Sequence, residues 1–197
     1  FFAAGFNTFA ILYVVQPILP DLTAYYGVTP TTASLSLSIT TFTLAVSMLI
    51  FGSISEAVGR KNIMIVSMLT ASILCIFTAF SPTFGSLIVM RALQGVALAG
   101  LPSIAMAYLG EEIHPRSLPG AMGLYISGNA LGAVFGRVFS GITAGLWGWQ
   151  YGLIGVGIVS LIATLIFWYA LSPSKHFVKR EFNVKDLFRS LTEHLKN

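Results

Sequence analysis

The sequence predicts an all-α integral membrane protein with six transmembrane helices. The first observation is composition, since 55% of the residues are hydrophobic, only 9% are charged and the mean hydropathy is +0.82. Soluble domains carry about 25% charged residues, so this chain lacks the side chains for a polar shell. The second is the length of the uncharged runs, which reach 34 residues at 22–55 and 29 residues at 62–90. The third is that Lys and Arg gather in alternate connections between the apolar segments.

Six segments are long and apolar enough to cross a bilayer, whose core of about 30 Å needs about 20 helical residues. The runs do not alternate between apolar and polar residues, as the strands of a membrane barrel would. The predicted spans are 1–16, 30–53, 62–80, 84–109, 119–145 and 147–171. They form one transmembrane bundle over residues 1–171, and a polar segment follows at 172–197.

Residues that interrupt helices separate these spans. In chain order they are Pro17 and Pro20, Pro30, the charged stretch 52–61, Ser81-Pro82, Pro115 and Pro119, and Trp147-Gly148-Trp149. Pro30 and Pro119 suit the first turn of a helix, where the missing N–H costs no hydrogen bond. In the polar segment, apolar residues recur with the spacing of one helix face, at Val184, Leu187, Phe188 and Leu191. We interpret 172–197 as a cytoplasmic linker whose short amphipathic helix lies on the membrane surface.

Basic side chains predict the orientation. Nine of them follow the even-numbered spans, at Arg60, Lys61, Arg116, Lys175, Lys179, Arg180, Lys185, Arg189 and Lys196. The first, third and fifth connections contain none. Since cytoplasmic loops carry the excess of Lys and Arg, the even-numbered connections and the tail are predicted to be cytoplasmic. The chain is then predicted to be a multi-pass membrane protein.

An internal repeat links the two halves of the bundle. A shift of 89 residues superposes Pro30 on Pro119, Gly52 on Gly141, and Gly59 on Gly148. The same shift replaces the basic pair Arg60-Lys61 by Trp149-Gln150, as expected for a turn on the opposite side of the membrane. The sequence therefore predicts two three-helix units in inverted topology, an arrangement typical of transporters.

Three motifs resemble those of the major facilitator superfamily. GSISEAVGRK at 52–61 is similar to the loop between the second and third helices of that family, and its matching residues are Gly52, Gly59, Arg60 and Lys61. Two positions differ, because Glu56 replaces the Asp of the motif and Ala57 replaces a basic residue. RALQGVALAG at 91–100 resembles the fourth-helix motif, with Arg91, Gln94 and Gly95 in place. GNALGAVFGRVFSG at 128–141 is similar to the fifth-helix motif of drug/proton antiporters, with Ala133 in place of Pro and Arg137 in place of Gly.

This resemblance implies the N-terminal half of a twelve-helix fold, packed against a C-terminal six-helix half that this chain does not contain. It implies a secondary active transporter that works by alternating access in a bacterial cytoplasmic (inner) membrane. The expected activity is proton-coupled efflux of a small molecule or drug, with a proton as partner and no cofactor. The alternative is a transporter of organic anions or sugars that uses Arg91 and Arg137 as the substrate site.

The same resemblance assigns a cytoplasmic gate to Gly52, Glu56, Gly59, Arg60 and Lys61. There Arg60 is expected to pair with Glu111 or Glu112, and the alternative is that the basic residues only set topology. Three glycines of the fifth span recur every four residues, at Gly128, Gly132 and Gly136, and allow close helix contact. That contact is either static packing or a sliding contact with the other half, and the family favours the second.

Arg91 and Arg137 each lie about eight residues inside a span, or about 12 Å deep. Ionisable groups at such depth are costly, so a functional role in a wet cavity is expected, with structural anchoring as the alternative. Four neutral polar residues are further candidates for the substrate cavity or for helix contacts: Asn7, Tyr13, Gln16 and Asn129.

Other classes of function lack their residues. All three histidines fall in cytoplasmic segments, and the one cysteine, Cys75, lies inside an apolar run, where we interpret it as core packing. These positions argue against an intramembrane enzyme and a zinc site. The net charge of +4 is too small and too localised to indicate nucleic-acid binding.

The orientation can be tested by labelling single cysteines in a Cys75→Ser background with an impermeant thiol reagent. A cysteine in the first, third or fifth connection should react from outside the cell. Lys61→Cys and Arg116→Cys should react only after the membrane is permeabilised. Labelling of Lys61→Cys and Arg116→Cys in intact cells would contradict the predicted topology.

Overall fold

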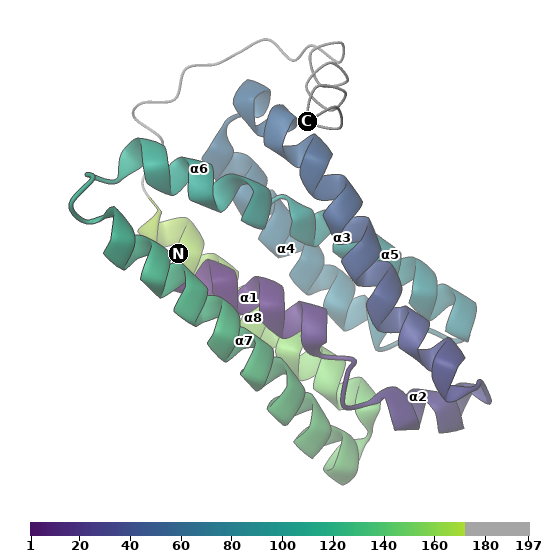
Figure 1. Ribbon diagram of the computed structural model, residues 1–197. Helices are drawn as coiled ribbons and strands as arrows, with labels where there is room; N and C mark the ends of the chain where they lie inside the picture. The colour runs from purple at the N-terminus through teal and green to yellow at the C-terminus, as the bar shows by residue number, and fades with distance from the viewer. Residues whose placement is uncertain (172–197) are drawn as a thin grey trace.

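The computed structural model describes residues 1–171, apart from the side chains at 53 and 56–58, and these residues form a bundle of helices without strands (Figure 1). The helices are α1 (Phe2–Tyr13), α2 (Leu19–Tyr26), α3 (Pro30–Val58), α4 (Arg60–Thr78), α5 (Phe84–Ala99), α6 (Pro102–Glu112), α7 (Leu118–Trp147) and α8 (Trp149–Ala170). The amphipathic helix expected within 172–197 lies outside the described residues.

Within the described chain, five segments are long and apolar enough to cross a membrane. They are Pro30–Gly52, Arg60–Thr78, Phe84–Glu112, Leu118–Trp147 and Trp149–Ala170. The sixth apolar segment is the shorter helix α1, Phe2–Tyr13. The predicted all-helical bundle of six apolar segments is therefore confirmed, whereas several of its boundaries need correction.

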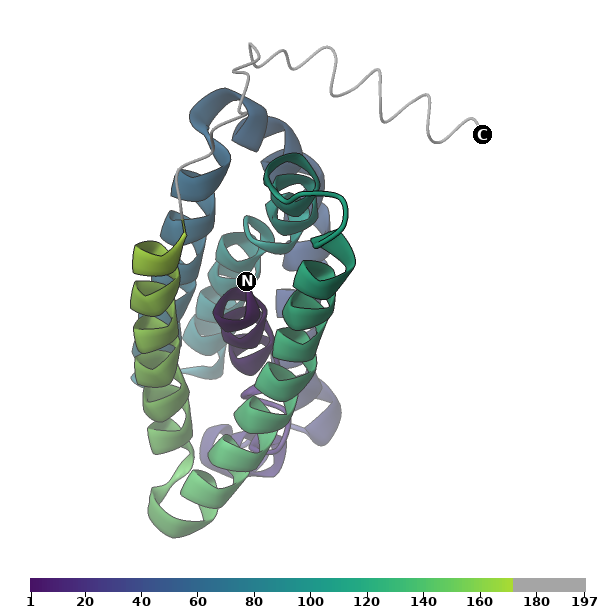
Figure 2. The same ribbon diagram turned by 90° about the vertical axis from the view of Figure 1, so that its left-hand side faces the viewer.

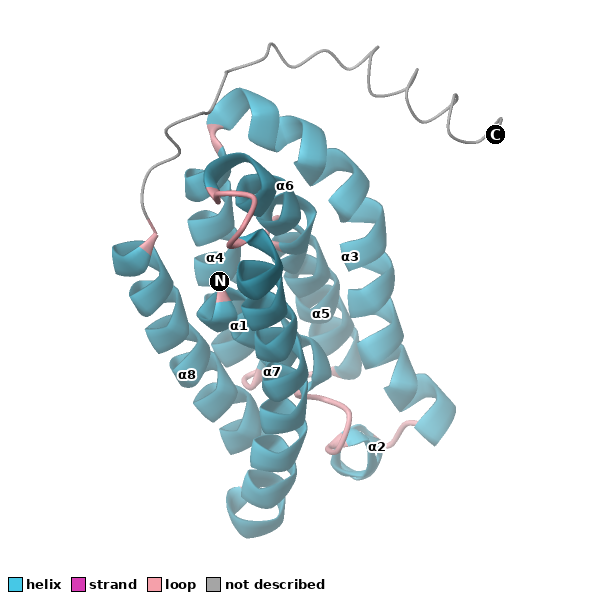
Figure 3. Ribbon diagram, turned by 60° about the vertical axis from the view of Figure 1, so that its left-hand side comes forward, coloured by secondary structure: helices cyan, strands magenta, loops and turns pink. Residues whose placement is uncertain are grey.

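The first predicted span, 1–16, ends early. Helix α1 stops at Tyr13, so its 12 residues extend only about 18 Å. The chain then loops to the short helix α2, in a segment that was predicted to be a connection (Figure 3). Gly27 ends α2 in the left-handed conformation, with φ +63°. This early break leaves backbone carbonyl groups of α1 in need of other donors.

The fourth predicted span, 84–109, is interrupted. Helix α5 ends at Ala99 and α6 begins at Pro102, so the single span Phe84–Glu112 consists of two helical segments. Pro102 has no N–H and cannot bond to the Leu98 carbonyl, as a helical residue there would. The Leu101 N–H donates to that carbonyl instead, at 3.4 Å. The missing donor explains the kink between α5 and α6.

The charged stretch 52–61 is mostly helical rather than a loop. Helix α3 continues to Val58, five residues beyond the predicted end, and α4 begins at Arg60. Only Gly59 leaves the helical path, with φ +108°, a conformation that a side chain would disfavour. One glycine is enough to make the turn.

The backbone repeats this turn 89 residues later. Helix α7 ends at Trp147, Gly148 adopts φ +111°, and α8 begins at Trp149. The two turns lie at opposite ends of the bundle, which we call the Gly59 end and the Gly148 end (Figure 1). The inverted repeat predicted from the sequence is therefore present in the fold.

Close helix contacts follow the same repeat. Helix α1 lies between α7 and α8 (Figure 2), and α3 packs against α5. A Cβ at Gly132 would lie 2.7 Å from the Phe6 Cα, and one at Gly128 or Gly136 would be 3.0 Å from a backbone carbon of α1. A Cβ at Gly95 of α5 would likewise overlap the Thr40 carbonyl of α3. The shift of 89 residues relates α1 to α5 and α3 to α7. The α1–α7 contact and the α5–α3 contact are therefore equivalent in the two three-helix units.

The glycine stripe tests this packing. Gly132→Ala should destabilise the protein by about 1–3 kcal/mol, because the added methyl overlaps the α1 backbone. The matched control is Gly123→Ala on the same helix, where a Cβ meets nothing within 4 Å. That change should be neutral or stabilise by up to about 1 kcal/mol. Thermal unfolding of the full-length protein in detergent measures both, and equal melting temperatures for the two variants would contradict the packing.

Candidate functional site

Arg91 is fully buried in α5 and has four hydrogen-bond acceptors. Its Nε donates to the Ser36 carbonyl of α3 at 3.1 Å. Its Nη1 donates to the Ile11 carbonyl at 3.1 Å and to Gln94 Oε1 at 2.8 Å, and its Nη2 donates to the Leu12 carbonyl at 2.9 Å. One guanidinium thus joins α5, α3 and the last turn of α1.

The carbonyl partners explain why an arginine can lie there. The last four carbonyls of a helix have no donor within the helix, and they carry its partial negative charge. Arg91 satisfies two of them at the end of α1 and supplies a compensating positive charge. The Gln16 N–H donates to the Tyr13 carbonyl at 3.1 Å, and Ser140 Oγ donates to the Val14 carbonyl at 2.8 Å.

This arrangement differs from the cavity role that sequence analysis favoured for Arg91. The side chain has no exposed surface, and its bonds go to backbone and to Gln94, three residues further along α5. These contacts support the alternative of structural anchoring, and the cavity role of Arg91 stays a prediction. The sequence signal for the contacts is the spacing of Arg91 and Gln94, one turn apart on the same helix.

Arg137 has a different environment. It is exposed on α7, and its Nε donates to the Ala133 carbonyl at 3.0 Å, one turn earlier in the same helix. Its Cζ lies 4.6 Å from the centre of the Tyr13 ring, a cation–π contact. Among the described side chains no carboxylate pairs with it. An exposed guanidinium on an apolar helix needs a wet cavity or another protein surface beside it.

The neutral candidates divide into structural and accessible residues. Asn7 is fully buried, and its Nδ2 lies near Ser72 Oγ at 3.2 Å, the Ser160 carbonyl at 2.9 Å and Thr164 Oγ1 at 2.9 Å. Asn7 thus ties α1 to α4 and α8. The half-buried Asn129 faces Gly5 of α1, and its buried Oδ1 has no hydrogen-bond partner among the described residues.

Gln16 is exposed in the loop after α1, and Tyr13 is half-buried beneath Arg137. Of the six residues expected in the cavity, the structure therefore brings Tyr13 and Arg137 into direct contact. Arg91 and Asn7 are enclosed by helices instead.

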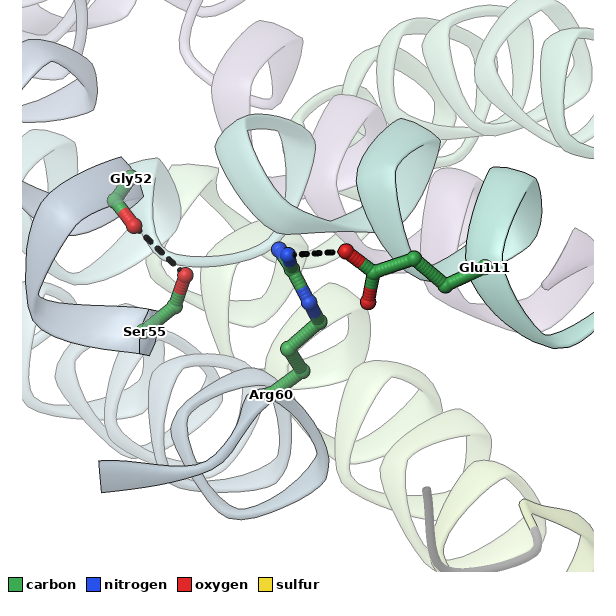
Figure 4. A network of polar contacts seen from close by, with 4 residues as sticks. All are labelled: Gly52, Ser55, Arg60 and Glu111. Atoms are coloured by element: carbon green, nitrogen blue, oxygen red, sulfur yellow. Dashed lines mark hydrogen bonds and ion pairs between the residues drawn. The ribbon is translucent and has the colours of Figure 1, made fainter. Parts of the chain in front are cut away.

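The gate residues gather at the Gly59 end. Arg60 Nη2 pairs with Glu111 Oε1 at 2.5 Å, which joins the start of α4 to α6 (Figure 4). Of the two carboxylates offered by the sequence, Glu111 is thus the one in contact with Arg60. Lys61 Nζ donates to the Leu171 carbonyl just after α8. Because the Glu111 side chain is 40% exposed, the ion pair contributes at most about 1 kcal/mol.

Other members of the gate motif complete this end of the bundle. Ser55 Oγ donates to the Gly52 carbonyl at 2.6 Å within the last turns of α3 (Figure 4). Gly59 makes the turn, and Glu112 is the last residue of α6. The side chain of Glu56 lies outside the described residues. We call Arg60, Lys61, Glu111 and Leu171 the Gly59-end cluster.

The glycines of the fifth predicted span also lie inside the bundle. Gly128, Gly132 and Gly136 are buried against α1, so in this structure their close contact is within one half. The other interpretation, a sliding contact with a second half, stays a prediction.

The described helices form two inverted three-helix units with a charged cluster at one end, an arrangement typical of membrane transporters. Comparison with known proteins makes the class specific, because the profile described as Major Facilitator Superfamily matches residues 1–196. The chain belongs to the major facilitator superfamily.

Several relatives, including YybF and YnfM, are similar over the whole chain. The MFS-type transporter YybF of Bacillus subtilis (strain 168) is 61% identical over 197 residues, covering 100% of this chain and 49% of YybF. The inner membrane transport protein YnfM of Escherichia coli (strain K12) is 41% identical over 196 residues, covering 100% of this chain and 47% of YnfM. The chain thus spans about half the length of these relatives.

A solved structure shows the same fold. The crystal structure of a bacterial homologue of the human lysosomal transporter Spinster, in an inward-facing and occupied conformation, matches with a TM-score of 0.71. The match covers 98% of this chain and 48% of that one at 19% sequence identity, and so concerns the fold alone.

Arg91→Gln tests the anchor. The loss of charged hydrogen bonds to the Ile11 and Leu12 carbonyls should cost about 3–6 kcal/mol, at about 1.5–3 kcal/mol each. The full-length variant should therefore melt well below the wild type, and transport should fail only as the fold fails. Arg116→Gln is the control, because Arg116 is exposed in the connection between α6 and α7. An Arg91→Gln variant with normal melting but no transport would assign Arg91 to the cavity instead.

Proposed function

We propose that the full-length protein is a secondary active transporter that works by alternating access. In this proposal the six-helix half rocks against a second six-helix half around a substrate site between them. The observation that carries the proposal is the inverted repeat, with matching glycine turns at Gly59 and Gly148 on opposite ends of the bundle. Inverted repeats of this kind, with binding sites near the bilayer midplane, are a common construction of secondary transporters.

The Gly59-end cluster is suited to a gate. It ties the α3–α4 turn to α6 and to the end of α8 through one ion pair and one hydrogen bond. Contacts that form in only one of two states bias the equilibrium between them. We propose that this end is cytoplasmic and that Glu56 adds a contact to the second half when the inner side is closed. The positive-inside pattern supports the orientation.

The proposed transport is proton-coupled efflux of small molecules across a bacterial cytoplasmic membrane. The likeness of 128–141 to the fifth-helix motif of drug/proton antiporters supports this assignment. Within the described helices, the acidic residues lie at helix ends or connections, as Asp21, Glu111 and Glu112 show. A proton-binding carboxylate at depth is therefore expected in the second half.

Arg137 favours a second candidate, the transport of organic anions. Its guanidinium is exposed and contacts the Tyr13 ring. Among the hydrogen bonds of the described residues, Nε is the one donor of Arg137 that is used. The planar fork of its two Nη groups suits a carboxylate or phosphate. Arg91, the other residue of that hypothesis, has its guanidinium bound to carbonyls and is not needed for it.

Flux through the full-length protein in sealed vesicles, with and without a pH gradient, tests both candidates. Proton-coupled efflux predicts substrate movement that stops when the gradient is collapsed. Gradient-independent exchange of anions would favour the second candidate.

Variants of Arg137 separate the candidates further. If Arg137 binds an anion, Arg137→Lys should weaken substrate affinity about tenfold or more, the effect of losing about 1.4 kcal/mol from a bidentate contact. Arg137→Gln should abolish binding while the melting temperature changes little, because the side chain is exposed. Wild-type affinity in both variants would remove Arg137 from the substrate site.

A further inference from the structure

Aromatic rings gather at the Gly148 end, where they join α2 to the beginnings of α5 and α8 (Figure 1). The centre of the Trp149 ring lies 5.3 Å from that of Tyr25 and 6.0 Å from that of Tyr26. The Tyr26 ring also lies 5.8 Å from that of Phe84, the first residue of α5, and its hydroxyl donates to the Ser81 carbonyl at 2.7 Å. We call Tyr25, Tyr26, Phe84 and Trp149 the aromatic clamp.

The clamp occupies the place that the Gly59-end cluster has in the other three-helix unit. The shift of 89 residues relates Trp149 to Arg60, and each is buried and is the first residue of its helix. The shift also relates Glu111, the partner of Arg60, to Leu22, which lies one turn before Tyr26 in α2. Since positive charge is disfavoured on the predicted outer side, aromatic packing there takes the place of the ion pair.

Helix α2 is a separate segment that the clamp holds in place. It has eight residues and is not part of the hydrogen-bond ladder of α1, because residues 14–18 between the two are not helical. The fully buried side chains of Ile18 and Leu22 also attach it to the bundle. Trp149 Nε1 is buried and has no hydrogen-bond partner among the described residues. Because an unmet buried donor costs free energy, opening of the clamp to water is partly offset.

We propose that the aromatic clamp is a conformational device whose release lets α2 move away from α8 and opens the Tyr13–Arg137 contact toward the Gly148 end. Tyr13 is the last residue of α1, so the short stretch 14–18 connects it directly to α2. A displacement of α2 therefore uncovers the end of α1 while the other helices stay packed. The consequence for transport rests on the proposed substrate site at Arg137, whereas the movement of α2 does not.

The first test measures the labelling rate of Ile18→Cys by a water-soluble maleimide in the purified full-length protein, in a Cys75→Ser background. Ile18 is fully buried beside α2, so the thiol should react only when α2 moves. Trp149→Ala should raise the rate about tenfold or more, the factor that corresponds to about 1.4 kcal/mol from two lost ring contacts. Trp147→Ala is the matched control, because Trp147 is 68% exposed and outside the clamp, and it should leave the rate unchanged. Equal rates with Trp149 and with Ala at that position would overturn the proposal.

The second test separates movement of α2 from unfolding of the bundle. Met64→Cys in the same background reports unfolding, because Met64 is fully buried in α4 near the Gly59 end, and Trp149→Ala should leave its labelling unchanged. Tyr26→Phe keeps the ring but loses one hydrogen bond, and it should raise the rate at Ile18→Cys about fivefold, which corresponds to about 1 kcal/mol. Equal increases at both reporter cysteines would overturn the proposal. Failure of the substrate site would appear in the Arg137 variants and would leave these labelling rates unchanged.

Discussion

The hydrogen bonds of Arg91 to the end of α1 are the interaction on which the rest of the structure depends. A helix that stops inside an apolar bundle leaves carbonyl groups that neither water nor lipid can satisfy there. Arg91 reaches from α5 to bind two of these carbonyls and also the Ser36 carbonyl of α3. The break in α1 is thus stable because a cation from the other three-helix unit is fixed beside it. The same break brings Tyr13 to the end of α1, under the exposed guanidinium of Arg137.

Around this anchor the described helices pack closely against one another. Backbone-to-backbone contacts at Gly132 and Gly95 lock α1 to α7 and α3 to α5, and Asn7 ties α1 to α4 and α8. Packed interiors of this kind do not deform continuously. Rearrangement is easier at the Gly59 end, where the Arg60–Glu111 pair is partly exposed and weak. Such a division between a rigid interior and adjustable ends suits rocking of one half against another.

Hydropathy and the 89-residue shift predicted the bundle, its inverted repeat and the glycine turns, because these features are written in residue type and spacing. The early end of α1 and the kink at Pro102 were not predicted. The hydropathy of a segment does not show where a backbone N–H is missing from a helix. For Arg91 the sequence favoured a cavity role and left structural anchoring as the alternative. The sequence could not rank the two, because the partners of Arg91 are carbonyls exposed by a helix break 80 residues away. Arg137 stays a candidate for the substrate cavity, because it lies on an exposed face of α7.

We propose that Arg91 is a fixed anchor and not a moving substrate ligand, and experimental structures of the full-length protein in inward-open and outward-open states test this most directly. The account predicts that the Arg91 guanidinium keeps its hydrogen bonds to the Ile11 and Leu12 carbonyls in both states, with and without bound substrate. A structure in which Arg91 leaves these carbonyls to contact the substrate or a carboxylate of the second half would contradict it.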